Sequence, residues 1–120
     1  MDSDPRLFHS GDYFNINDSE PTRSVLTQSA DAAVVAWTVL PGQSIPPHIH
    51  PHGQDSFVIL SGAGSYQIDA TGTFVPVKAG DVIVARRGEV HALFNDPSAQ
   101  EPIRLISIVS PADAGRVAVP

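Results

Sequence analysis

Residues 42–62 read GQSIPPHIHPHGQDSFVILSG, and this segment holds three of the chain's five histidines. His48 and His50 are two residues apart, so on a β-strand both side chains would point to the same face of the sheet. Two neutral imidazoles side by side offer adjacent ligands for a transition-metal ion. Prolines on both sides of the pair are also typical of a polar loop, so the pair alone does not establish a metal site.

A second segment, residues 80–95, reads GDVIVARRGEVHALFN and contributes a further histidine, His91. Together the segments follow the patterns G-x5-H-x-H-x4-D-x6-G and G-x5-R-x-G-x2-H-x3-N. These patterns resemble the two sequence motifs of the cupin superfamily, in which a glutamate stands at the aspartate position and a proline at the arginine position. About one hairpin and one strand separate the two segments, as in the family. The resemblance spans Gly42 to Asn95, nearly half of the chain.

The resemblance implies a fold and a metal site. Cupins are double-sheet jelly rolls, so we expect an all-β double-stranded β-helix of roughly six to eight strands with little or no helix. By analogy His48, His50 and His91 would be metal ligands, Asp55 would take the acidic ligand position, and Asn95 would be structural or line the pocket. The implied cofactor is one divalent ion, and Mn²⁺, Fe²⁺, Co²⁺, Ni²⁺ and Zn²⁺ all suit this ligand set.

The acidic position departs from the family pattern, because the side chain of Asp55 is one methylene shorter than that of glutamate. It has less reach toward a metal that histidine nitrogens hold at about 2.0–2.1 Å. Gln54 could supply an amide oxygen instead if the strand register differs by one residue. His52 stands two residues after His50, so on a continuing strand its side chain would point to the same face as the histidine pair. Its proline and glycine neighbours instead favour a solvent-facing loop. We expect the fourth ligand to be Asp55, then Gln54, then His52, in that order.

The second departure is Arg86, at the position where the family usually has proline. Arg86 and Arg87 are two of only seven basic residues, and they stand in a turn that leads to His91. They could receive a carboxylate or phosphate group of a substrate in bidentate geometry. The alternative, which we favour, is an exposed turn that could pair across a dimer interface.

Outside the motifs the chain is predicted to be a single β-rich domain over residues 1–120. Its 11 prolines and nine glycines divide it into short apolar segments, and none shows a sustained helical apolar period. We expect strands at 24–28, 33–40, 56–60, 65–69, 73–77, 81–85, 91–94 and 104–109. The expected organisation is an N-terminal arm, a jelly-roll barrel and a tail, over residues 1–22, 24–109 and 112–120.

Several predicted strands are apolar on both faces, among them residues 33–37 and 57–60. An antiparallel sheet with one face in water usually alternates apolar and polar side chains. Strands that are apolar on both faces therefore predict that the outer face is also covered. A second copy of the chain is the simplest cover, so we expect a homodimer.

Composition excludes several kinds of chemistry. The chain has no cysteine, which rules out disulfides, thiolate nucleophiles and every cysteine-ligated metal site. Its net charge of −6 disfavours binding to nucleic acid or to anionic membranes. The N-terminus shows no basic and apolar leader, and no apolar run reaches the length of a membrane span, so we expect a cytoplasmic protein.

The leading functional hypothesis is a small mononuclear-metal enzyme acting on a compact, oxygenated organic molecule. Three histidines and one oxygen ligand leave open coordination positions for substrate oxygens or O₂. Dioxygenation of an enol or diketone, an oxidoreductase reaction, is slightly favoured over isomerase, cyclase or lyase chemistry. In those reactions a non-ligating carboxylate or His52 would be the general base. The alternatives are a non-catalytic cupin that binds a sugar or another metabolite, and a metal that only stabilises the barrel.

Overall fold

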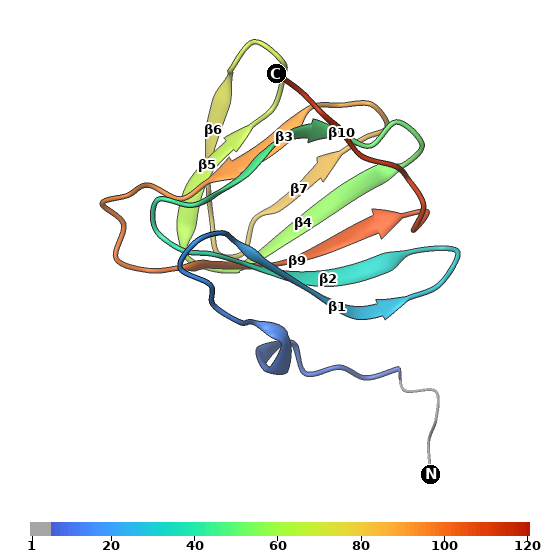
Figure 1. Ribbon diagram of the computed structural model, residues 1–120, viewed down its shortest axis with the longest axis horizontal. Helices are drawn as coiled ribbons and strands as arrows, with labels where there is room; N and C mark the ends of the chain where they lie inside the picture. Colours follow the sequence, from blue (N-terminus) through green and yellow to red (C-terminus); the bar gives the residue numbers. More distant parts are fainter. Residues whose placement is uncertain (1–5) are drawn as a thin grey trace.

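Short apolar segments between glycine and proline turns form strands from Thr22 to Ala118, as the computed structural model shows for residues 6–120 (Figure 1). The described residues contain one helical element, the short 3₁₀ turn η1 (Ser10–Tyr13). The strands are β1 (Thr22–Gln28), β2 (Ala33–Val39), β3 (Ser44–Ile49), β4 (Gln54–Ser61), β5 (Ala63–Gln67), β6 (Phe74–Lys78), β7 (Val82–Ala85), β8 (His91–Phe94), β9 (Ile103–Ser110) and β10 (Val117–Ala118).

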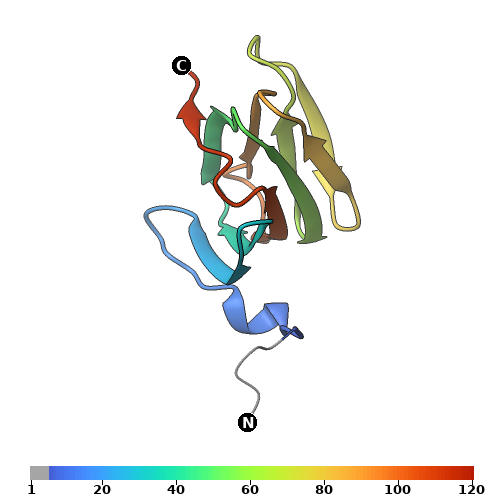
Figure 2. The same ribbon diagram turned by 90° about the vertical axis from the view of Figure 1, so that its right-hand side faces the viewer.

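The strands form two five-stranded sheets that face each other (Figure 2). The first sheet has the order β1-β2-β9-β4-β7, and the second has the order β10-β3-β8-β5-β6. Every neighbouring pair is antiparallel. The chain passes repeatedly between the two sheets, which is the double-stranded β-helix expected from the motifs. That prediction of the fold class is confirmed.

The apolar core fills the space between the two sheets. Its buried members include Phe57 and Ile59 from β4 and Leu105 from β9, all at most 1% exposed. Because side chains alternate along a strand, Asp55 and Ser107 face inward in the same rows as these apolar residues. The interior is therefore apolar over most of its length and polar beside Asp55 and Ser107, where β4 and β9 are paired.

All eight predicted strands are present, and the structure adds two that the sequence analysis did not expect. One is β3, whose Pro46 and Pro47 lack backbone N–H groups, so its pairing with β8 is interrupted between Ile45 and His48. The other is β10, which lies within the expected tail and pairs Val117 with Ile49 of β3. The end of the chain thus lies beside the strand that carries His48.

The expected N-terminal arm precedes the sandwich. Residues 1–5 of that arm lie outside the described residues, and β1 begins at Thr22. No helix in the described part of the chain is both long and apolar enough to cross a membrane.

Several motif residues serve the backbone. Asn95 is buried, and its side-chain amide donates to the carbonyls of Val39 at 2.9 Å and Glu101 at 3.0 Å. Gly62 has a φ of 84°, and a Cβ there would lie 2.4 Å from the carbonyl oxygen of Pro102. Only glycine fits such a position without displacing backbone. Asn95 is therefore structural, one of the two roles expected for it.

Candidate metal centre

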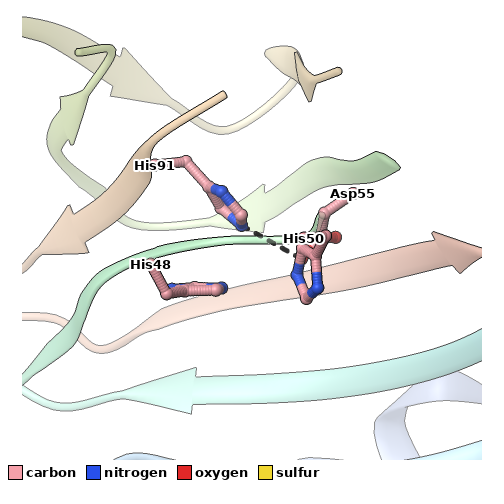
Figure 3. Close-up of side chains that lie close together, drawn as sticks. All are labelled: His48, His50, Asp55 and His91. Carbon is pink, nitrogen blue, oxygen red and sulfur yellow. Dashed lines mark hydrogen bonds and ion pairs between the residues drawn. The ribbon is translucent and has the colours of Figure 1, made fainter. Parts of the chain in front are cut away.

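Three strands and the turn after β3 bring four buried polar side chains together between the sheets (Figure 3). His48 lies on β3, His50 directly follows that strand, His91 begins β8, and Asp55 is on β4 of the opposite sheet. One nitrogen or oxygen atom from each of the four lies within 4.8 Å of those of the other three. This cluster is the one assembled in the sequence analysis from the two motifs, and it could hold a metal ion.

Backbone carbonyls orient two of the imidazole rings. The Nδ1 atom of His48 lies 2.8 Å from the carbonyl oxygen of Pro46, and the Nδ1 atom of His50 lies 2.6 Å from that of Gly115. A carbonyl can only accept, so in each ring Nδ1 carries the proton and donates it. The Nε2 atom of each ring is then the one free to bind a metal, and such hydrogen bonds are usual for metal-ligating histidines.

Asp55 contacts two of the histidines and a hydroxyl. Its Oδ2 atom lies 3.2 Å from Nε2 of His50 and 3.2 Å from Nε2 of His91, and its Oδ1 accepts a hydrogen bond from Ser107 at 2.5 Å. Two ligands at about 2.1 Å from one ion are separated by roughly 3.0–3.4 Å at octahedral to tetrahedral angles. The observed separations therefore fit a shared ion, and the shorter side chain of Asp55 does reach the histidines.

Burial and hydrogen bonding set the protonation states of the cluster. Burial lowers the pKa of His48 to about 4, and the charges of His91, Arg116 and His50 act in the same direction. Burial opposes ionisation of Asp55, but hydrogen bonds from His50, His91 and Ser107 outweigh it and hold the pKa of that carboxyl well below its usual range. For His50, burial is outweighed by hydrogen bonds to Asp55 and Gly115, which raise its pKa above 6.5.

These shifts predict how the stability of the metal-free protein depends on pH. His48 has a pKa of 6.5 when unfolded and about 4 when folded, so the unfolded state binds more protons between these values and stability falls as pH drops from 6.5 to 4. We expect a loss of about 1–2 kcal/mol, reduced by solvent screening at the open site. His50 has the opposite effect, and at higher pH. Its pKa is higher in the folded state than the unfolded value of 6.5, so the stabilisation it gives is complete below pH 6.5 and is lost as the pH rises through the pKa of the folded state.

Urea unfolding of chelator-treated protein at a series of pH values measures this dependence. In His48→Gln the side-chain amide can still donate to Pro46 but does not titrate, so the stability loss between pH 6.5 and 4 should shrink. An unchanged slope in that variant would assign the titration to another group.

A cavity of about 520 Å³ leads from the cluster to the surface. Its walls include His48, His50, Asp55 and Ser107, together with residues that the sequence analysis did not single out as ligand contacts. Those residues are Arg23, Trp37, Val109, Ala112, Asp113, Gly115 and Arg116. No motif marks them, because they meet only through the pairing of β1 with β2 and the return of the C-terminal segment to β3. An open cavity of this size is typical of a small-molecule site.

The alternative fourth ligands and the two motif arginines lie elsewhere. His52 and Gln54 are both exposed, and Gln54 points to the opposite face of β4 from Asp55. Arg86 and Arg87 are exposed too, and neither lines the cavity that contains the histidines. The guanidinium of Arg86 lies 4.0 Å from the carboxylate of Glu89, an exposed pair within one turn.

Comparison with known proteins identifies the family. The cupin domain family model matches residues 35–109, well over half of the chain, so the protein belongs to the cupin family. A crystal structure from Klebsiella pneumoniae, described as a conserved protein with a double-stranded β-helix domain, is 38% identical and superposes with a TM-score of 0.90. The match covers 98% of this chain and 99% of that one.

Two further proteins are less similar. The rice (Oryza sativa subsp. japonica) germin-like protein 9-3 is 34% identical over 96 residues, which is 78% of this chain and 43% of that protein. The chain thus spans less than half the length of this curated relative. The polyketide cyclase RemF from Streptomyces resistomycificus shares the fold with a TM-score of 0.78 at 21% identity, over 96% of this chain and 85% of that one.

Proposed function

We propose that this cupin is an enzyme that binds one divalent metal ion through His48, His50, Asp55 and His91 and acts on a compact, oxygenated organic molecule. The observation that carries the proposal is the combination of four buried donor side chains with an open cavity lined by three of them, His48, His50 and Asp55. A metal that serves only to stabilise a barrel needs no such access, because structural sites are closed. A catalytic site needs an open position, and the cavity provides a way to it.

A metal bound there would act as a Lewis acid or would bring O₂ and substrate together. The protein's own part is to direct Nε2 of two imidazoles toward Asp55, to keep Asp55 ionised and to line the cavity with the apolar side chains of Trp37 and Val109. Asp113 is the cavity carboxylate outside the donor cluster, so in isomerase, cyclase or lyase chemistry it would be the general base. The metals we expect are Mn²⁺, Fe²⁺, Co²⁺, Ni²⁺ or Zn²⁺.

The reaction class that we place first is dioxygenation, because the donor set leaves coordination positions free for O₂ as well as substrate. Isomerisation, cyclisation or elimination comes second, and a non-catalytic cupin that binds a sugar or another metabolite is the alternative. Fold similarity at low identity does not distinguish these, since the same fold carries unrelated activities.

Reconstitution with each of the five metals in turn tests the proposal. The loaded protein would be screened against enols, β-diketones and hydroxy acids, with O₂ uptake and product NMR recorded in parallel. We expect turnover with at least one metal, its loss on chelation and its recovery when the metal is returned. Turnover that survives complete metal removal would contradict a metal-dependent reaction, and saturable binding without turnover would favour the non-catalytic alternative.

We also propose that the protein is a homodimer that covers the outer face of the first sheet. On its edge strand β7, Val82 is 62% exposed and Val84 is 42% exposed. They pair with Val58 and Ser56, which flank the inward-facing Phe57, so both valines point outward.

An exposed apolar edge strand is an association site unless something covers it. Light scattering should give twice the chain mass, and Val82→Lys/Val84→Lys should give a folded monomer. A monomeric wild type would remove this proposal.

A further inference from the structure

Two arginines flank the mouth of the cavity, and they reach it from different sheets. Arg23 lies on β1, the edge strand of the first sheet, and Arg116 immediately precedes β10, the edge strand of the second. The segment between β9 and β10 connects the two sheets (Figure 2). Arg116 lies in this segment and lines the cavity. The arrangement places two guanidinium groups around one opening.

Neither arginine has a carboxylate partner among the residues that the structure describes, although the chain has 13 acidic residues. Two carboxylates, Asp55 and Asp113, line the same cavity. Asp55 is already hydrogen-bonded to His50, His91 and Ser107, so Asp113 is the carboxylate left to offset the two guanidinium groups. This local excess of positive charge stands out in a chain whose net charge is −6. Such a mouth attracts small anions.

The wall between the arginines and the donor cluster is partly apolar. Trp37 is the cross-strand partner of Arg23, and both line the cavity together with Val109 and Ala112. A ligand matched to this cavity has an anionic end, for the guanidinium groups, and an apolar body, for the indole and aliphatic side chains. A carboxylate suits the arginines because a guanidinium group can donate two parallel hydrogen bonds to it.

We infer that Arg23 and Arg116 bind the carboxylate of a small organic acid whose apolar body lies over Trp37, Val109 and Ala112. The inference rests on the proposed function and narrows its substrate class from oxygenated organic molecules to organic carboxylates. It also moves the anion contact from Arg86 and Arg87, the pair suggested by the sequence, to two arginines that line the cavity.

Trp37 makes the inference measurable, because it is the chain's single tryptophan and lines the cavity. We would titrate the Zn²⁺-loaded protein, and in parallel the chelator-treated protein, with cyclohexanecarboxylate while recording tryptophan fluorescence. Cyclohexanecarboxamide has the same size and no charge, so it reports the contribution of the apolar body alone. We expect saturable binding of the carboxylate that weakens as salt is added, and markedly weaker binding of the amide.

The variants Arg23→Gln and Arg116→Gln should each weaken carboxylate binding roughly threefold to tenfold, and the double variant should weaken it more, with little effect on the amide. The matched control is Arg86→Gln/Arg87→Gln, which removes the same charge outside the cavity and should leave binding unchanged. Equal affinity for acid and amide, unchanged binding in the Arg23/Arg116 double variant, or no saturable binding up to the solubility limit of the acid would overturn the inference.

The metal content of the same samples separates this result from a failure of the proposed function. Uptake of Zn²⁺ by a protein whose carboxylate binding ignores Arg23 and Arg116 would leave the metal site standing and reject the anion site. Arginine-dependent carboxylate binding in a protein that takes up none of the five expected metals would support the anion site and reject the metal enzyme.

Discussion

Replacing His48 and His50 together with alanine is expected to abolish metal binding. Wild-type protein reconstituted with Fe²⁺, Mn²⁺ or Zn²⁺ and then desalted should hold about one metal ion per chain, because four donors converge on one position. The double variant keeps only His91 and Asp55, and two ligands do not retain a divalent ion against dialysis. Elemental analysis of both proteins, prepared side by side, measures the difference.

A second double variant controls for the loss of histidines as such. His9 and His52 are exposed and lie outside the donor cluster, so His9→Ala/His52→Ala removes the same number of imidazoles and should keep the full metal content. Far-UV circular dichroism checks that both variants remain folded. Metal retained in the His48/His50 variant would contradict the site, as would a wild type that takes up none of the five expected metals.

The donor cluster could be predicted from the sequence because the spacing of the first histidines is local and the two motifs supply the rest. The two-residue period of a strand predicts that His48 and His50 point to one face, and the structure has His48 on β3 and His50 directly after it. The resemblance to the first cupin motif assigns Asp55 to the acidic position, and the alternation along β4 turns Asp55 inward and Gln54 outward. His91 comes from a distant strand, and only the resemblance of the second motif to the cupin pattern linked it to the others. The eight predicted strands followed from short apolar segments between turn residues, which is also a local signal.

The cavity wall could not be predicted, because its residues meet through long-range pairing. The Nδ1–H of His50 is held by the carbonyl of Gly115, 65 residues further along the chain, and β10 follows directly in what read as a tail. Arg23 and Trp37 face each other through the register of β1 and β2, which composition does not fix. Arg86 and Arg87 are close to His91 in the sequence, but their side chains do not line the cavity. Closeness in the sequence is therefore no guide to the cavity wall.

The second large effect is expected from Asp55→Ala, which should weaken metal binding by one to two orders of magnitude, about 10–100-fold. Asp55 is 4% exposed and holds its charge through hydrogen bonds from His50, His91 and Ser107, so it is ready to bind a cation at neutral pH. Its removal takes away an anionic ligand and also the acceptor that positions Nε2 of His50 and His91. Competition with a chromogenic chelator measures the affinity of each variant.

Gln54→Ala is the matched control, because Gln54 is the adjacent residue, is exposed and points to the other face of β4. Its affinity for the metal should equal that of the wild type. Asp55→Asn separates charge from shape, since the amide oxygen can still accept a hydrogen bond from Ser107 but carries no charge. Affinity lost in Asp55→Asn as fully as in Asp55→Ala would assign the effect to charge. Unchanged affinity in both, with a loss in Gln54→Ala, would transfer the fourth ligand to Gln54, and the strand would have to shift by one residue to allow it.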